Sequence, residues 1–187
     1  MLHQWKQRHI DFISCIYILK NMELKKITTQ KDIELVKSFF YKLFIDETGY
    51  DLIHFKQSVS GKHNFKRLEY YLGYEYNTLV GICGMYANQP DECWLGWFGI
   101  LPEYRRKGYA TAMLNLLTEM MKNYGYKVCR IYTDVVTNKD AVCLYIKQGF
   151  KQDSAYLGNI ITMSKSLDGI TVAKKWKGEP VAFVTPS

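Results

Sequence analysis

The stretch with the clearest chemical potential is residues 105–108, which read Arg-Arg-Lys-Gly. An aromatic and apolar run at 93–101 predicts a strand before it, and apolar residues at helical spacing over 111–121 predict a helix after it. The first N–H groups of a helix have no intrahelical acceptor, and the helix dipole adds partial positive charge there. Gly108 leaves room for an anion to approach the backbone. The pattern therefore favours a phosphate site, although a solvated basic turn is the more common meaning of such a triplet.

Length and composition fit one soluble globular domain, since 48% of the 187 residues are hydrophobic and 23% are charged. The formal charge of +7 is uneven, because residues 1–21 and 172–187 carry +2 each and leave +3 for residues 22–171. A mildly basic core suits a small polyanionic cofactor better than a nucleic acid. The nucleic-acid alternative would rest on the basic triplet and the basic tail, and it predicts DNA affinity that falls steeply with salt.

Five cysteines without a C-x-x-C pair favour reduced thiols in a cytoplasmic protein. With only four scattered histidines, the sequence predicts no metal site. The early apolar run at residues 12–19 is shorter than the ~20 residues that a spanning helix needs, and no small-residue cleavage site follows it. We therefore expect no membrane segment, and we interpret residues 1–21 as an extension outside the core.

Periodicity along the chain predicts a mixed α/β fold. Strands are expected at 23–27, 68–76, 78–86, 93–101, 127–135, 150–157 and 159–167, and helices at about 29–46, 51–60, 111–121 and 137–148. The stretch from Thr28 to Asp32 supplies an N-cap and a first-turn acid for the first helix. If the central helix is a crossover, the strand after it runs parallel to the strand before it. These elements make a mixed sheet of about seven strands with helices on both faces.

Two motifs make the chain resemble the GNAT superfamily of acyl-CoA N-acyltransferases. The phosphate signature of that family is Arg or Gln, two residues, Gly, one residue, then Gly or Ala, and it is matched by Arg105, Gly108 and Ala110. The second signature is matched from Asn138 to Phe150, about thirty residues downstream. The resemblance covers roughly residues 22–168 and implies one GNAT N-acetyltransferase domain. The tail at 169–187 would lie outside it, as an added strand or as a homodimer contact.

The resemblance implies acetyl-CoA as the cofactor, with its acetyl group passing directly to an amine. Neither a Walker A loop nor a dinucleotide-binding fingerprint fits the glycine spacing, so coenzyme A is the preferred polyanion. Backbone N–H groups near the triplet would hold the diphosphate, and the preceding strand would pair with the pantetheine arm. The cofactor residues predicted in this way are Phe98, Gly99, Ile100, Arg105, Arg106, Lys107, Gly108, Tyr109, Ala110, Thr111 and Asn138. Asn138 has an equal alternative role as a helix N-cap.

Two residues are predicted to transfer protons. Tyr145 matches the family position that protonates the leaving thiolate, although a tyrosine on the buried face of a short helix is also an ordinary core residue. An amine with a pKa of ~10.4 is almost wholly protonated at pH 7, so the acceptor needs a base. Glu92 is the candidate, directly or through water, with a solvated strand-end carboxylate as its alternative role; Glu69 and Glu75 are weaker candidates.

The acceptor is expected to be a primary amine of a small molecule or of a protein, and the sequence does not choose between them. Six aromatic residues on the predicted strands are candidates for lining its pocket: Tyr70, Tyr71, Tyr74, Tyr76, Trp94 and Trp97. The basic charge of the protein disfavours polycationic acceptors. The competing function is a non-catalytic module that binds acyl-CoA and regulates a partner.

Overall fold

The structure is a computed structural model that describes residues 21–44, 52–155 and 158–175. The chain divides into two compact units. Unit 1 takes its residues from Met1–Tyr86 and Gly96–Leu117, and unit 2 from Ala87–Leu95 and Thr118–Ser187. Several predictions fall outside the described residues: most of the N-terminal extension, the end of the first helix beyond residue 44, and the tail beyond residue 175.

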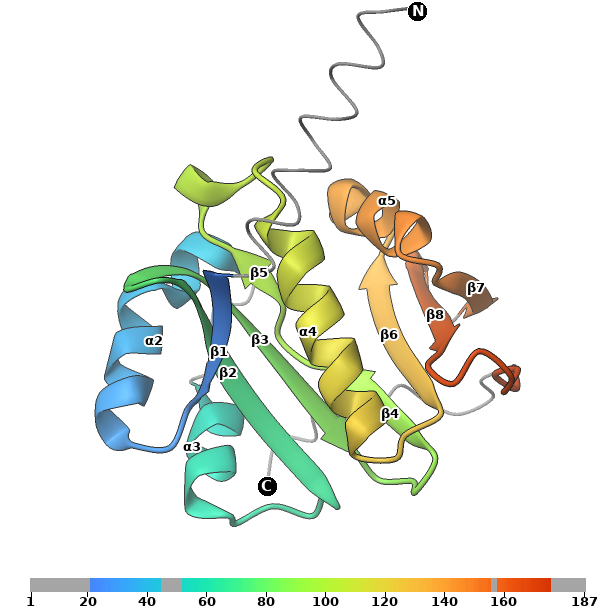
Figure 1. The fold of residues 1–187 in the computed structure, drawn as a ribbon, viewed down its shortest axis with the longest axis horizontal. Coiled ribbons are helices and arrows are strands. Elements are labelled where there is room, and N and C mark those ends of the chain that lie inside the picture. Colours follow the sequence, from blue (N-terminus) through green and yellow to red (C-terminus); the bar gives the residue numbers. More distant parts are fainter. Residues whose placement is uncertain (1–20, 45–51, 156–157, 176–187) are drawn as a thin grey trace, which may run out of the picture. The chain divides into compact units, whose positions relative to one another are not determined.

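Unit 1 contains four strands and the helices that follow or precede them. Its elements are β1 (Met22–Lys26), α2 (Gln30–Leu43), α3 (Ile53–Ser60), β2 (Arg67–Glu75), β3 (Thr78–Ala87), β5 (Gly99–Ile100), the 3-10 helix η1 (Pro102–Tyr104) and the start of α4 (Tyr109–Asn123). Strand β1 pairs antiparallel with β2, from Met22 opposite Glu75 to Lys26 opposite Tyr71. Figure 1 shows β1 and β2 side by side with α2 and α3 alongside them.

The start of α2 is fixed by a capping box. The Thr29 side chain accepts a hydrogen bond from the backbone N–H of Asp32, and the Asp32 carboxylate accepts one from the backbone N–H of Thr29. Four apolar side chains of α2 are buried at helical spacing: Ile33, Val36, Phe39 and Phe40. The predicted cap and apolar face are therefore confirmed.

Strand β2 contacts a helix on each of its faces. On one face, the ring of Tyr70 lies 4.4 Å from the ring of Phe55 in α3, measured between centroids. On the other face, a Cβ added to Gly73 would lie 2.7 Å from the sulfur of Met113 in α4. Since successive strand residues point to opposite faces, α3 and α4 cover opposite sides of β2. Gly73 allows α4 to approach closely because it has no side chain.

Unit 2 is a second group of strands with α5 packed on it. Its elements are β4 (Glu92–Leu95), the end of α4, β6 (Val128–Asp134), α5 (Lys139–Lys147), β7 (Lys151–Ala155) and β8 (Ile160–Ser166). Strand β4 runs parallel to β6, which confirms the predicted crossover, while β8 pairs antiparallel with both β6 and β7 (Figure 1). Buried side chains include Cys129, Ile131, Tyr145, Phe150 and Met163.

The predicted continuous strand at 93–101 is wrong, because the chain leaves the strand between β4 and β5. The backbone N–H of Gly96 donates to the carbonyl of Gly84 at 2.8 Å. The Trp97 ring packs against Phe40 and Phe44 of unit 1, with centroids 5.2 and 4.8 Å apart. The described residues therefore form eight strands where about seven were expected. The mixed α/β class itself is confirmed, since parallel and antiparallel pairs are both present.

The described part of the tail, residues 169–175, contains no strand. The carbonyl of Lys174 in this segment accepts a hydrogen bond from the Arg130 side chain. Within the described ranges, no helix combines the length and the hydrophobicity that crossing a bilayer requires.

Candidate active site

The basic triplet lies in a tight loop between η1 and α4 in unit 1. Arg106 has a φ of 61° and Gly108 a φ of 91°, whereas Lys107 between them does not have a positive φ. A left-handed arginine costs roughly 1–3 kcal/mol, and such strain concentrates at ligand sites and switches. Residues that alternate between right-handed and left-handed backbone conformations also point their successive N–H groups toward one side, as in anion-binding nests. The loop thus has the backbone form that a phosphate group requires.

Two of the three cationic side chains of this loop donate hydrogen bonds to nearby backbone carbonyls. Arg105 Nε donates to the carbonyl of Ile100 at 3.0 Å, and Lys107 Nζ donates to the carbonyl of Glu103 at 2.9 Å. Lys107 Nζ also lies 5.5 Å from the ring centroid of Tyr104. All three basic residues are exposed. Because carbonyls and rings neutralise no formal charge, the loop keeps its positive potential toward solvent.

The first turn of α4 supplies backbone donors at the same place. The backbone N–H of Ala112 donates to the carbonyl of Gly108 at 3.1 Å, which is an ordinary intrahelical bond. The amides of Tyr109, Ala110 and Thr111 come before it, where a helix has no acceptor of its own to offer. The predicted diphosphate-binding residues from 105 to 111 therefore lie together at one helix start.

The predicted pantetheine residues at 98–100 lie at the end of the strand break. Phe98 precedes β5, and Gly99 and Ile100 form it. One edge of β5 pairs antiparallel with β3, with Gly81 opposite Ile100. A Cβ on Gly81 would lie 2.3 Å from the Gly99 carbonyl oxygen, so glycine is required for this close pairing. The predicted pairing of β5 with a pantetheine arm stays a prediction.

Tyr145 lies in unit 2, on the buried side of α5. Its side chain is only 4% exposed and its ring centroid lies 5.7 Å from that of Phe150. Burial raises the pKa of Tyr145 above its ordinary value, and the nearby Cys129 adds to the shift. The hydroxyl therefore stays protonated at neutral pH, which is the state that a proton donor needs.

Asn138 stands at the N-cap of α5 but its side chain makes no capping hydrogen bond. The turn before the helix is held by Asp134, whose carboxylate accepts from the backbone N–H of Val136 at 2.7 Å and of Thr137 at 2.9 Å. These bonds lower the pKa of Asp134. The exposed amide of Asn138 is thus not used for capping, although it occupies the cap position.

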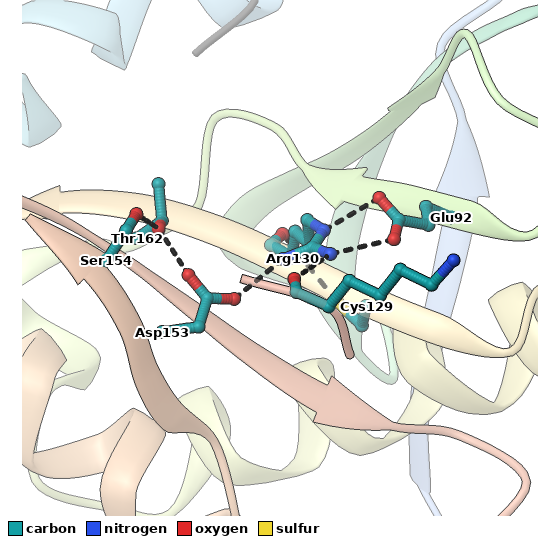
Figure 2. Close-up of polar contacts among 7 residues, drawn as sticks. Glu92, Cys129, Arg130, Asp153, Ser154 and Thr162 are labelled. Atoms are coloured by element: carbon teal, nitrogen blue, oxygen red, sulfur yellow. Dashed lines mark hydrogen bonds and ion pairs between the residues drawn. The ribbon is translucent and has the colours of Figure 1, made fainter. Parts of the chain in front are cut away.

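Glu92 forms an ion pair that the sequence analysis did not foresee. Arg130 Nε and Nη2 each donate to a Glu92 oxygen at 2.7 Å, and Arg130 Nη1 donates to Asp153 at 2.6 Å (Figure 2). Arg130 Nη2 also donates to the carbonyl of Lys174 at 2.8 Å. The Arg130 side chain is 1% exposed, whereas that of Glu92 is 21% exposed. We call Arg130, Glu92 and Asp153 the buried charge cluster.

The buried charge cluster extends into hydroxyl groups of β7 and β8. Thr162 donates to Asp153 and shares a hydrogen bond with Ser154, as Figure 2 shows. Burial alone would lower the pKa of Arg130, but the bonds and charges of Glu92 and Asp153 raise it. The guanidinium is therefore permanently charged and fully paired. A lone arginine inside the apolar run at 128–133 was the sequence signal for such a cluster, but it does not name the partners.

The aromatic residues considered for the acceptor pocket divide by burial. Tyr70, Tyr71 and Trp94 are at most 4% exposed, and Trp97 packs in the phenylalanine cluster described above. Tyr76, by contrast, is 56% exposed at the β2–β3 turn. No group of His, Cys, Asp and Glu suited to holding a metal ion occurs within the described residues.

The predicted site residues are thus distributed over both units. Residues 98–111 come together in unit 1, whereas Glu92, Asn138 and Tyr145 belong to unit 2, where Tyr145 and Glu92 contact different neighbours. Arg130 and Asp153 were missed, as was the partner of the Tyr109 side chain, which is Glu75.

Comparison with known proteins identifies the family. The profile of the acetyltransferase (GNAT) family matches residues 33–150, which include the loop at the start of α4 and the segment from Asn138 to Phe150. The chain therefore belongs to the acetyltransferase (GNAT) family, as its two motifs predicted. An N-alpha-acetyltransferase of Saccharolobus solfataricus is 46% identical over 54 residues, which are 28% of this chain and 32% of that protein. The match thus spans about a third of that relative's length.

Solved structures agree with this assignment at the level of the fold. An acetyltransferase of the GNAT family from Desulfovibrio desulfuricans has a TM-score of 0.65 at 12% identity, covering 78% of this chain and 99% of that one. An N-acetyltransferase from Campylobacter jejuni, in complex with acetyl coenzyme A, has a TM-score of 0.59 at 15% identity and covers 78% of this chain and 98% of that one. The predicted GNAT-like fold is confirmed.

Proposed function

We propose that the protein is an N-acetyltransferase that passes an acetyl group from acetyl-CoA directly to a primary amine of a small molecule or a protein, within a ternary complex. The observation that carries this proposal is the loop at the start of α4. There Arg106 and Gly108 have positive φ, and three exposed basic residues come directly before helix amides that precede the first intrahelical bond. The loop has the spacing of the family signature and lies inside the region that matches the family.

Bound acetyl-CoA would supply the thioester and, through its diphosphate, the anion that this loop suits. The amides from Gly108 to Thr111 would bind the diphosphate, with charge added by Arg105, Arg106 and Lys107. Phe98, Gly99 and Ile100 would present backbone groups to the pantetheine arm, and the amide of Asn138 would bind the same arm. Similar structures that contain acetyl-CoA or CoA support this cofactor.

Tyr145 would act as the general acid. As the amine nitrogen forms its bond to the acetyl carbon and the carbon–sulfur bond breaks, the Tyr145 hydroxyl would give its proton to the leaving sulfur. The raised pKa of Tyr145 keeps that proton on the hydroxyl until the sulfur develops negative charge.

Glu92 would act as the base that removes a proton from the amine, directly or through water. Both of its oxygens already accept hydrogen bonds from Arg130, so this role requires a lone pair outside the ion pair. The Glu92→Gln variant tests it. Loss of turnover with little change in unfolding free energy supports the base role, whereas loss of stability at full specific turnover assigns Glu92 to structure alone.

A non-catalytic CoA-binding module is the second candidate, and one observation favours it. The Tyr145 hydroxyl belongs to a side chain that is 4% exposed, which is more typical of a core residue. The two candidates differ in turnover. We expect free thiol to accumulate when the protein is incubated with acetyl-CoA and a panel of amino acids, amino sugars, polyamines and peptides with free N-termini. Cofactor binding without thiol release across the panel would establish the module instead.

We also propose a cytoplasmic location and a homodimer. The described cysteines carry free thiols, with Cys83, Cys93 and Cys129 buried and Cys143 exposed, as a reducing compartment allows. Fractionation of the source cells tests the location, and light scattering on the purified full chain tests the dimer.

A further inference from the structure

The first residue of α4 is tied to the sheet of unit 1 by one long-range hydrogen bond. The Tyr109 hydroxyl donates to Glu75, which is the last residue of β2. Tyr109 directly follows Gly108, so this bond ends at the loop assigned to the diphosphate. It joins residues 34 positions apart in the sequence.

The side chains of Arg105 and Lys107 in the loop make contacts with residues nearby in the sequence. Arg105 binds a carbonyl five residues before it, and Lys107 binds one four residues before it. The Lys107 contact stabilises the internal shape of the loop, and the Arg105 contact ties the loop to β5, but neither reaches the strand under the first turn of α4. The bond from Tyr109 to Glu75 does reach it, because its acceptor belongs to β2, which is paired over five residues with β1.

A second contact shows how α4 is seated on β2. Met113 lies four residues after Tyr109 on the same helical face, and it packs on Gly73, two residues before Glu75 on the same strand face. Two successive turns of α4 therefore rest on two successive same-side positions of β2. The Met113 contact is apolar and permits rotation, whereas the Tyr109 bond is directional and sets the angle of the first turn.

The Tyr109 hydroxyl remains a hydrogen-bond donor over the ordinary pH range. Its side chain is 8% exposed, and the edge of the ring meets the ring of Tyr104 with centroids 6.0 Å apart. Burial, then the hydrogen bond and charge of Glu75, and then Tyr104 raise the pKa of Tyr109 to about 12. The hydroxyl therefore keeps its proton throughout the ordinary pH range.

We propose that Glu75 is a positioning residue for cofactor binding, because through Tyr109 it fixes the first turn of α4 and so orders the amides that receive the diphosphate. This inference rests on the proposed function of the loop as a CoA site. It assigns Glu75 a role different from that of a base.

The direction in which CoA affinity changes when the Glu75 carboxylate is removed distinguishes positioning from simple charge repulsion. A carboxylate near a diphosphate site repels the ligand if its charge acts alone, so removing it would tighten binding. If Glu75 acts by positioning, removing it weakens binding. The glutamine variant is informative because its amide oxygen still accepts from the Tyr109 hydroxyl without the negative charge.

The experiment measures CoA affinity by isothermal titration calorimetry and KM and kcat for acetyl-CoA, using the full chain. Glu75→Ala and Tyr109→Phe are each expected to raise Kd and KM by about tenfold, since each removes the same charge-assisted bond, with kcat at saturation nearly unchanged. The double variant should be no weaker than either single variant. Glu75→Gln should restore Kd to within about threefold of the unchanged protein.

Two control variants remove a similar group at a different place in unit 1. Glu23→Ala removes an equal charge from the neighbouring strand, and Tyr41→Phe removes an exposed hydroxyl from α2; neither should change Kd. Unchanged Kd in Glu75→Ala and Tyr109→Phe overturns the inference, even if both variants are less stable to urea. Tighter binding in Glu75→Ala also overturns it. Absence of CoA binding by the unchanged protein overturns the proposed function itself, which makes the two failures distinguishable.

Discussion

Two regions of the molecule hold cationic side chains in opposite ways. In the loop before α4, three basic residues are exposed, and two of them donate hydrogen bonds to nearby carbonyls. In unit 2, Arg130 is 1% exposed and binds two carboxylates. Exposed cations on a shaped backbone remain available to an anionic ligand, whereas a buried cation with two acids is committed to the structure. The difference predicts which substitutions change stability and which change binding.

The largest effect is expected from Arg130→Met. It leaves the Glu92 and Asp153 carboxylates without their cation, and breaking such a buried pair costs about 3–5 kcal/mol. Urea denaturation of the variant measures this loss. Arg105→Met, which removes an exposed guanidinium, should change the unfolding free energy by less than about 1 kcal/mol.

A companion variant sharpens this result. Adding Glu92→Gln and Asp153→Asn to Arg130→Met removes both orphaned charges and should recover part of the lost stability. No recovery would mean that lost packing, and not unpaired charge, explains the single variant.

The next largest effect is expected from Gly108→Glu on CoA affinity. The new carboxylate would face the diphosphate, and we expect Kd to rise by at least about a hundredfold, or roughly 2.7 kcal/mol. Gly125→Glu is a matched control, because Gly125 has a φ of 90° against 91° for Gly108 and has open space around it. Urea denaturation should find a similar loss of stability in both variants, and calorimetric titration should find weakened binding only in Gly108→Glu. Equal Kd values would remove the loop from the binding site.

A third prediction tests whether unit 2 contributes to chemistry as well as stability. Tyr145→Phe should lower kcat about a hundredfold by removing the proton donor, while CoA affinity stays within about twofold. Steady-state kinetics and titration of the same preparation measure both quantities. Tyr124→Phe, which alters an exposed tyrosine at the end of α4, should leave both unchanged. Full turnover in Tyr145→Phe would make Tyr145 a core residue only.

The smallest effect is expected from Lys107→Ala. Removing one exposed charge beside the helix start should raise the CoA Kd by about three- to tenfold and leave the unfolding free energy within about 0.5 kcal/mol. The loss should shrink as salt is added, because exposed charges are screened. Lys122→Ala removes the same charge from the last turn of α4 and serves as the control. A large loss of stability in Lys107→Ala would contradict the comparison between the two regions.

Local patterns predicted the parts of the fold that depend on neighbours in sequence. The cap at Thr29, the apolar face of α2 and the parallel pairing of β4 with β6 were all foreseen from periodicity and helix-start signals. The loop at 105–108 was foreseen for the same reason, because a glycine, a helix start and a basic triplet are adjacent in the chain.

Contacts between distant residues could not be predicted in this way. Arg130 is separated from Glu92 by 38 positions and from Asp153 by 23, and no local pattern specifies which acid meets which base. The strand break after Leu95 was missed because Trp97 looks like a strand residue, yet its ring joins the cluster around Phe40 and Phe44. Glu75 was considered as a base, and only the three-dimensional structure shows its bond to Tyr109.

The hydrogen bond from Arg130 to the carbonyl of Lys174 joins two residues that are synthesised at different times. Arg130 and Lys174 are 44 positions apart, and Asp153 lies between them in the chain. At translation rates of about 5–20 residues per second, roughly two to nine seconds separate the synthesis of Arg130 from that of its last described partner. Glu92 is made before Arg130, so during that interval a carboxylate partner is already present and the later partners are not yet all present. The full set of hydrogen bonds around Arg130 can therefore form only after residue 174 has been made.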